Sequence, residues 1–197
     1  MGEADQNRSM HPSTNWYRIV LATLLLIGGA TLLLPSAMAE DWKRVASKDG
    51  KVSALFPVDI RKNLQTQTDR TLAGKVESKF GEFYGDGIML AGSGSDLPRL
   101  ALAASDKKVF ESTKKTFLSQ AKGKQLSFKA STVAGLPAWV LLYKGDAYQG
   151  KGKPYQGRAV FMIVNKRMYI LNSVISEATA ENKAAEKKLF GSIKVSK

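Results

Sequence analysis

Two apolar segments joined by only two residues constrain the fold of this chain more than any other feature. The segments are residues 158–164 and 167–174, and the connection is Asn165-Lys166. A two-residue connection with Asn at its first position predicts a tight β-hairpin. Strands joined by short turns must be antiparallel. The chain therefore has to build an antiparallel sheet around this hairpin.

Turn-forming residues divide the rest of the chain into short strands and two helices. Asp49-Gly50 predicts a second hairpin. Residues 105–122 have apolar side chains at three- and four-residue steps, which predicts an amphipathic helix. Strands are expected at 42–46, 51–56, 74–84, 88–91, 99–104, 125–130 and 138–143, a loop at 92–98 and a closing helix at about 177–190. These elements predict an α+β fold with an antiparallel sheet flanked by helices, an α/β/α sandwich.

An apolar leader precedes the predicted domain. Its uncharged stretch begins at Ile19 and ends at Leu34. This is slightly shorter than the roughly 20 residues that a membrane-spanning helix needs. The small residues Ala37 and Ala39 then form an A-x-A pattern, which is typical of signal-peptide cleavage.

Cleavage at this pattern defines the expected organisation of the protein. We expect residues 1–39 to be a signal peptide and residues 40–197 to form a single domain. The domain would then be periplasmic or secreted. The alternative is a leader that is retained and anchors the protein in the membrane, which is the one predicted route to membrane contact.

Histidine and cysteine are almost absent. The single histidine is His11, in the leader, and the chain contains no cysteine. Residues 40–197 therefore cannot build a Ser-His-Asp or Cys-His nucleophile system. They also cannot build a zinc site from imidazole or thiolate ligands. We predict no cofactor, no metal site and no catalytic residues.

The sharpest enzyme-like pattern is S-x-x-K, the serine–lysine spacing of penicillin-recognising enzymes. It pairs Ser105 with Lys108 and Ser112 with Lys115. The K-T-G and S-D-N partner motifs do not follow, and Ser and Lys are common in this chain. Chance explains the pattern, and a histidine-independent hydrolase using Ser–Lys or carboxylate groups is the least favoured interpretation.

A glycine-rich loop resembles a nucleotide-binding motif without meeting its requirements. G-x-x-x-x-G-K runs from Gly145 to Lys151, but Gly152 replaces the Ser or Thr that holds magnesium. The loop also connects two predicted strands, whereas a phosphate-binding loop leads into a helix. Basic and aromatic residues nevertheless surround it: Lys144, Tyr148, Lys151, Lys153, Tyr155 and Arg158. A solvated hairpin tip is the favoured interpretation of these residues, and an anion- or partner-binding loop is the alternative.

Positive charge dominates the chain, with a formal net charge of +13. Such charge speeds association with acidic partners but does not define them. We therefore predict an exported, non-catalytic binding or accessory protein whose partner is an acidic envelope protein or an anionic polymer. Nucleic-acid binding is the alternative, and it would require the lysines to form one continuous stripe. The lysine-rich side of the helix at 105–122 is expected to be a solvated face, with an anion-binding face as the other interpretation.

Several structural motifs together resemble the exported PsbP-like domains, which share a fold with the Ran-binding Mog family and with small bacterial exported proteins. The resemblance covers residues 41–195 and depends on Trp42, Asp49-Gly50, Pro57, Gly135-Leu136-Pro137-Ala138, Arg158, Asn165-Lys166, Tyr169-Ile170-Leu171 and Phe190-Gly191-Ser192-Ile193. It implies an antiparallel sheet sandwiched by helices, and binding rather than catalysis. No catalytic motif is available for transfer, and the lack of histidine excludes any histidine-dependent ion role.

Overall fold

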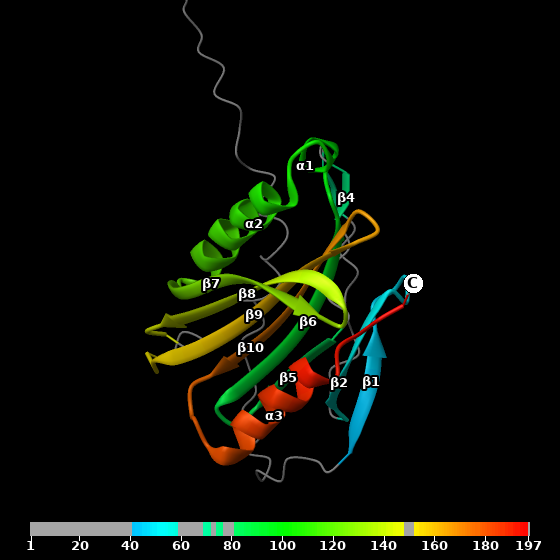
Figure 1. Cartoon of the computed structure of the whole chain (residues 1–197). Coiled ribbons are helices and arrows are strands. Elements are labelled where there is room, and N and C mark those ends of the chain that lie inside the picture. Colours follow the sequence, from blue (N-terminus) through cyan, green and yellow to red (C-terminus); the bar gives the residue numbers. More distant parts are fainter. Residues whose placement is uncertain (1–40, 59–68, 72–73, 77–80, 148–151, 197) are drawn as a thin grey trace, which may run out of the picture.

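The structure is a computed structural model and describes residues 41–58, 69–71, 74–76, 81–147 and 152–196 (Figure 1). These residues form, in chain order, β1 (Trp42–Ala46), β2 (Val52–Pro57), β3 (Asp69–Thr71), β4 (Gly74–Val76), β5 (Gly81–Gly85), β6 (Ile88–Asp96), α1 (Arg99–Leu102), α2 (Asp106–Ala121), β7 (Lys124–Val133), β8 (Leu136–Gly145), β9 (Tyr155–Val164), β10 (Arg167–Ile175), α3 (Ala180–Gly191) and β11 (Lys194–Val195).

Some of the sequence-based predictions fall outside the described residues. They are the leader from Ile19 to Leu34, its cleavage residues Ala37 and Ala39, and the loop residues Tyr148 and Lys151. Within the described residues, no helix combines the length and the apolar character needed to cross a membrane.

Antiparallel hairpins build the main sheet. Its six strands pair in the order β5-β6-β10-β9-β8-β7, and each pair is antiparallel. β1, β2 and β11 form a three-stranded sheet, and β3 and β4 form a two-stranded one. β11 joins β2 through the pairs Lys194↔Ser53 and Val195↔Val52. The two ends of the described chain therefore meet in one small sheet.

The hairpin predicted at Asn165-Lys166 is confirmed. Both residues have positive φ angles, 50° and 64°, as a type I′ turn requires. Val164 and Arg167 pair directly across this turn. The connection between β1 and β2 contains the predicted Asp49-Gly50, where Gly50 has a φ of 69°. Glycine adopts this conformation without the steric penalty of a side chain.

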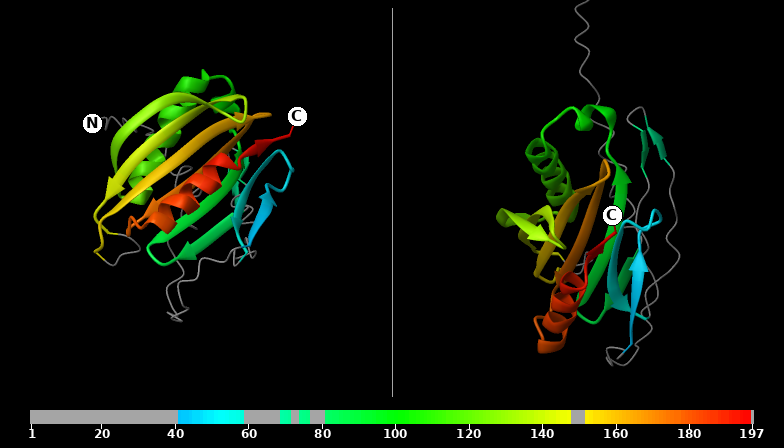
Figure 2. Two further views of the ribbon diagram at one scale, coloured as in Figure 1. Left: turned by 60° about the horizontal axis from the view of Figure 1, so that its bottom comes forward. Right: turned by 45° about the vertical axis from the view of Figure 1, so that its right-hand side comes forward.

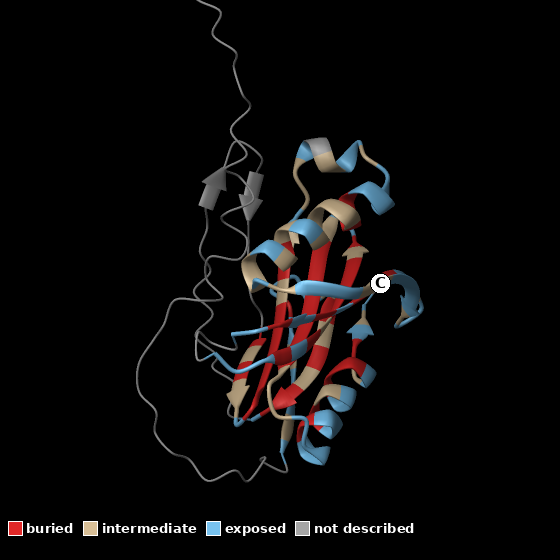
Figure 3. Ribbon diagram, turned by 90° about the vertical axis from the view of Figure 1, so that its left-hand side faces the viewer, coloured by how far each residue is buried: buried red, intermediate tan, exposed pale blue. Residues whose placement is uncertain are grey.

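The two faces of the main sheet carry separate apolar clusters. Consecutive residues of a strand point to opposite faces, so Val160 and Phe161 of β9 belong to different clusters. Phe161 packs with Phe117 of α2, whereas Val160 belongs with Leu189 of α3 and Phe56 of β2. Figure 2 shows α2 and the β1–β2 hairpin on opposite sides of the six-stranded sheet. Figure 3 shows that the buried residues are concentrated on the strands of the sheet.

These observations confirm the predicted α+β class with antiparallel sheets. The α/β/α sandwich remains a prediction, because the core that contains α3 also contains residues of the three-stranded sheet. The helix predicted at 105–122 is confirmed as α2, and the closing helix begins at Ala180, three residues later than expected.

Residues 99–104 were expected to form a strand, and this prediction is wrong. Arg99–Leu102 instead form the short helix α1. Pro98 precedes it with a φ of −61°, and the Pro98 carbonyl accepts the N–H groups of Ala101 and Leu102. The proline thereby sets the backbone direction at the helix start.

The loop predicted at 92–98 is also wrong over most of its length, because β6 continues to Asp96. Gly94 pairs with Tyr169 across β6 and β10. A Cβ atom at Gly94 would lie 2.9 Å from Cε1 of Tyr169. Glycine here makes room for a buried ring rather than for a turn.

The strand expected at 74–84 corresponds to β4 and β5, and residues 77–80 between them are not described.

Candidate functional site

A shallow pocket of about 580 Å³ lies where the end of α3 meets the three-stranded sheet. Four cationic side chains line it: Arg44 of β1, Lys187 and Lys188 of α3, and Lys194 of β11. The other lining residues are Leu55, Ala184, Gly191, Ser192 and Ile193. We refer to this site as the Arg44 pocket.

Hydrogen bonds hold the wall of the Arg44 pocket together. Nη1 of Arg44 donates to the Ser192 carbonyl at 3.0 Å and to Oγ of Ser53 at 3.2 Å. The Leu55 N–H donates to Oγ of Ser192 at 2.7 Å, and that hydroxyl donates to the Leu189 carbonyl at 2.8 Å. The guanidinium group is therefore positioned before any ligand arrives, which lowers the ordering cost of binding.

The charge of the pocket is positive. Nζ of Lys188 lies 4.6 Å from the centroid of the Trp42 ring, a cation–π contact. Lys187 and Lys194 are exposed, and no Asp or Glu is among the lining residues. The negative end of the α3 dipole opposes an anion by about 0.3–1 kcal/mol. The last carbonyls of the helix, however, already accept the N–H of Ser192.

The lining residues of the Arg44 pocket offer both positive charge and apolar surface to a ligand. Ile193 is buried and Leu55 is half-buried, so the site combines apolar surface with cations. The pocket contains no carboxylate or imidazole to act as a base, and the Ser192 hydroxyl is hydrogen-bonded. Ser105, at the N-cap of α2, and Ser112, within α2, do not line it. Among the described residues, no group of three or more His, Cys, Asp or Glu side chains could hold a metal ion.

Two of the lysines predicted at the glycine-rich loop, Lys144 and Lys153, are described, and they lie at its two ends. Lys144 is exposed near the end of β8, where it pairs in register with Lys124 of β7. Lys153 donates from Nζ to Oε1 of Glu177 at 2.9 Å. This hydrogen bond and the Glu177 charge raise the pKa of Lys153. An anion at Lys153 would therefore have to compete with a carboxylate.

The predicted residues of β9 are directed to opposite faces of the sheet. Tyr155 is buried, and its hydroxyl donates to the Ala121 carbonyl. Burial also raises the pKa of Tyr155. The Arg158 guanidinium lies 4.6 Å from the centroid of the Phe190 ring of α3. Tyr155 and Arg158 therefore cannot contact one ligand together, and stacking on Tyr155 would require its ring to leave the core.

The cations of the Arg44 pocket are not recognisable as a site from the sequence. Arg44 and Lys187 are separated by most of the domain and become neighbours only because α3 packs beside β2 and β11 pairs with it. The two-residue strand β11 has no sequence pattern of its own. The only available clue was the concentration of basic residues near both ends of the domain.

Similarity to known proteins identifies the fold of this chain. No protein-family model and no curated protein matches the chain. The chain is similar to the solution structure of cyanobacterial PsbP (CyanoP) from Synechocystis, with 13% identity, a TM-score of 0.54, and coverage of 87% of this chain and 99% of that chain. The chain has a PsbP-like fold.

Two further solved structures match this PsbP-like chain with lower scores. LpqN, involved in cell envelope biogenesis of Mycobacterium tuberculosis, has 13% identity and a TM-score of 0.41, covering 80% of this chain and 91% of that one. The Ran-binding protein Mog1p of Saccharomyces cerevisiae has 13% identity and a TM-score of 0.43, covering 79% and 95%. The fold assignment depends on the CyanoP match, which has the higher TM-score.

Proposed function

We propose that this protein is an exported, non-catalytic binding or accessory protein of the cell envelope, and that the Arg44 pocket binds an acidic segment of a protein partner. The supporting observation is a set of four cations beside apolar surface, with no carboxylate among the lining residues. Export is inferred from the leader that ends at Ala37 and Ala39.

A protein segment fits this site because the site offers two kinds of surface. Lys187 and Lys194 provide exposed charge for Asp or Glu side chains, and Arg44 retains donors for a bidentate carboxylate contact. Leu55 and Ile193 provide apolar surface for a neighbouring side chain of the same segment. The net charge of +13 favours rapid association with an acidic partner.

A labelled peptide of alternating glutamate and leucine tests the pocket. Every described element lies within residues 40–197, so this form is used at 50 and 200 mM salt. The test variant combines Lys187→Gln and Lys194→Gln, because both lysines are exposed and their replacement should leave the fold intact. The matched control combines Lys129→Gln and Lys166→Gln, two exposed lysines away from the pocket.

We expect the pocket variant to bind the peptide about ten-fold more weakly than wild type, equivalent to about 1.4 kcal/mol, and the control to bind like wild type. Binding should weaken with salt because the contacts are electrostatic. Equal affinities for the pocket variant and the control would exclude the Arg44 pocket as the binding site. Failure of wild type to bind at 50 mM salt would exclude an acidic segment of this composition.

A further inference from the structure

α2 contains a repeat that the Arg44 pocket does not use. The S-x-x-K spacing occurs three times in succession between the N-cap and the C-cap of α2, at seven-residue intervals: Ser105 with Lys108, Ser112 with Lys115, and Ser119 with Lys122. Seven residues are close to two helical turns, so the repeated residues lie on one side of the helix. We call Lys108, Lys115 and Lys122 the lysine stripe.

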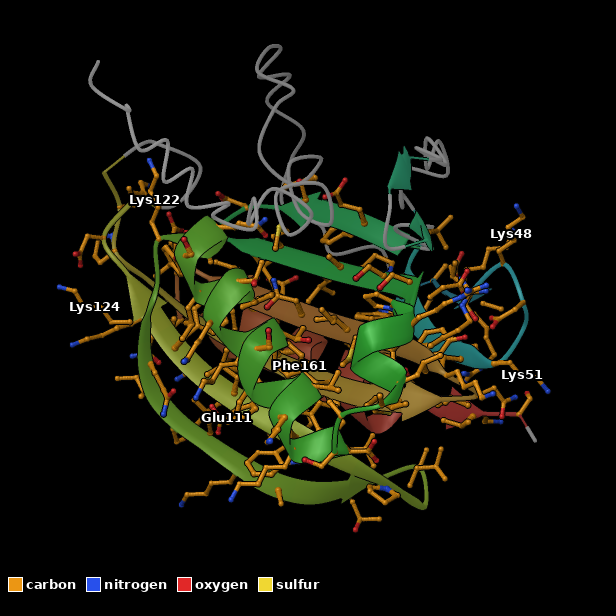
Figure 4. The ribbon with its side chains drawn as sticks, turned by 90° about the horizontal axis from the view of Figure 1, so that it is seen from above. Lys48, Lys51, Glu111, Lys122, Lys124 and Phe161 are labelled. Carbon is orange, nitrogen blue, oxygen red and sulfur yellow. The ribbon has the colours of Figure 1, made fainter. Side chains whose placement is uncertain are left out.

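The lysine stripe lies on the solvent side of α2. All three lysines are exposed, whereas Phe110 and Phe117 are buried against the sheet. Figure 4 shows Phe161 beneath α2 and Lys122 projecting away from the domain at the end of the helix. With a rise of 1.5 Å per residue, successive lysines are about 10.5 Å apart along the axis. The stripe is a line of regularly spaced positive charges.

Acidic residues on α2 neutralise little of this charge. Asp106 stands in the first turn, where it complements the positive end of the helix dipole. Glu111 is the one carboxylate near the middle of α2, and its Oε2 accepts from Nζ of Lys114 at 2.5 Å. Lys114 in turn lies over the Phe128 ring at 4.6 Å. Glu111 is therefore paired on the flank of the helix that faces β7.

The last lysine of the stripe occupies an unfavourable backbone conformation. Lys122 has φ 49° and ψ 36°, in the left-handed region. Helices end in this conformation most often with glycine, because a side chain there is sterically disfavoured. A lysine at this position opposes local stability and extends the line of charges by two helical turns. Residues that break a local rule in this way are often functional.

We propose that the lysine stripe binds a linear acidic polysaccharide laid along α2. The interval between lysines is close to the length of two sugar units in an extended chain, so alternate carboxylates can meet successive lysines. Ser119 lies between Lys115 and Lys122, and Ser105 precedes Lys108. Both serines are exposed, so their hydroxyl groups lie beside the charges, where sugar hydroxyls need hydrogen-bond partners. This surface is distinct from the Arg44 pocket, which lies at the end of α3.

The same face lacks what a single-stranded nucleic acid requires. Binding of unpaired bases depends on exposed aromatic rings on which they stack. The aromatic residues of α2 are Phe110 and Phe117, and both are buried. Charge, spacing and hydroxyl groups therefore favour a carboxylated sugar polymer over single-stranded DNA or RNA.

The test measures binding of residues 40–197 to polygalacturonate across a salt series, with neutral dextran and duplex DNA as comparison polymers. A triple variant changes Lys108, Lys115 and Lys122 to Gln. Its control changes Lys129, Lys166 and Lys183, which are exposed elsewhere, to Gln and has the same net charge. Lys122→Gly provides a variant in which binding and stability should change in opposite directions.

We expect the triple variant to lose at least ten-fold in affinity at 50 mM salt. The slope of log affinity against log salt should fall by about two, since each lost contact contributes about 0.7. Lys122→Gly should raise Tm and still weaken binding several-fold, which separates the loss of charge from unfolding. Glu111→Gln should tighten binding two- to three-fold, because it removes the nearby negative charge.

Three results would overturn the proposal. The first is wild-type affinity for polygalacturonate no higher than for dextran at 50 mM salt. The second is an equal loss of affinity in the triple variant and its control, which would indicate net charge rather than the stripe. The third is tighter binding to duplex DNA than to polygalacturonate, with the triple variant losing both, which would assign the stripe to nucleic acid. None of these three results would contradict the function proposed for the Arg44 pocket.

Discussion

Replacing Asp49 by Asn should loosen the β1–β2 hairpin from the main sheet. The Asp49 carboxylate accepts from Oγ of Ser47 at 2.7 Å, from the Lys51 N–H at 3.2 Å, and from the Tyr169 hydroxyl. Nη1 of Arg167 lies 3.4 Å from Oδ2. The contacts with Tyr169 and Arg167 connect the turn after β1 to β10.

The size of the stability loss follows from the hydrogen bonds that the amide of Asn can no longer accept. Asn keeps one carbonyl oxygen, but its NH₂ group cannot accept from Tyr169 or pair with Arg167. A hydrogen bond to a charged group contributes about 1.5–3 kcal/mol, and the Asp49 side chain is only 24% exposed. We therefore expect Asp49→Asn to lower the free energy of unfolding by about 2 kcal/mol. For a domain of this size, that corresponds to a fall in Tm of about 4–8 °C.

The loss of stability caused by Asp49→Asn should depend on pH. Partial burial would raise the pKa of Asp49, but hydrogen bonds from Tyr169, Ser47 and Lys51, together with the Arg167 charge, outweigh it and lower the pKa. A carboxylate whose pKa is lower in the folded state contributes its full stability above the unfolded pKa, about 3.9. That contribution disappears as the pH falls through the folded pKa. The difference between wild type and variant should therefore shrink on acidification below about pH 4.

Urea unfolding at pH 7 and pH 3 measures this difference directly. Asp146→Asn is the matched control, because Asp146 is 87% exposed and lies 4.0 Å from Nζ of Lys124. Exposed pairs of this kind contribute about 0–1 kcal/mol. Equal effects of the two variants at pH 7, or a loss at Asp49 that persists undiminished at pH 3, would refute the assignment of Asp49 as the link between hairpin and sheet.

Two further predictions concern the core beneath α2, each measured by urea unfolding. Gly157→Ala should destabilise the protein by about 1–3 kcal/mol, because a Cβ atom there would lie 2.2 Å from Cζ of Tyr143. Gly191→Ala is the control and should not destabilise it, because a Cβ atom there would meet no atom within 4 Å. Similar losses of stability in both variants would contradict this prediction. Tyr143→Phe should cost about 1–3 kcal/mol, because the hydroxyl donates to Oδ1 of buried Asn172 at 2.8 Å, and an unchanged stability would show that water replaces the bond.

Local sequence determined the hairpins and the long helices of this protein. Asn165-Lys166 allows only a two-residue turn, so the strands on either side had to pair. The three- and four-residue apolar steps of 105–122 define one buried helix face, and that face is the one that packs on Phe161. These features depend on neighbours within a few residues, and their patterns are therefore visible in the sequence.

Tertiary structure decided the features that depend on distant residues. Gly94 lies within a strand, opposite Tyr169, which is distant in the sequence, and the absence of a side chain at Gly94 leaves room for the Tyr169 ring. Tyr155 was assigned to a binding loop from its local surroundings, yet its ring is buried beside Tyr143 and its hydroxyl reaches Ala121. Arg44 meets Lys187 and Lys194 only after β11 has paired with β2. No local pattern records such contacts, because they form between segments that only the packed core brings together.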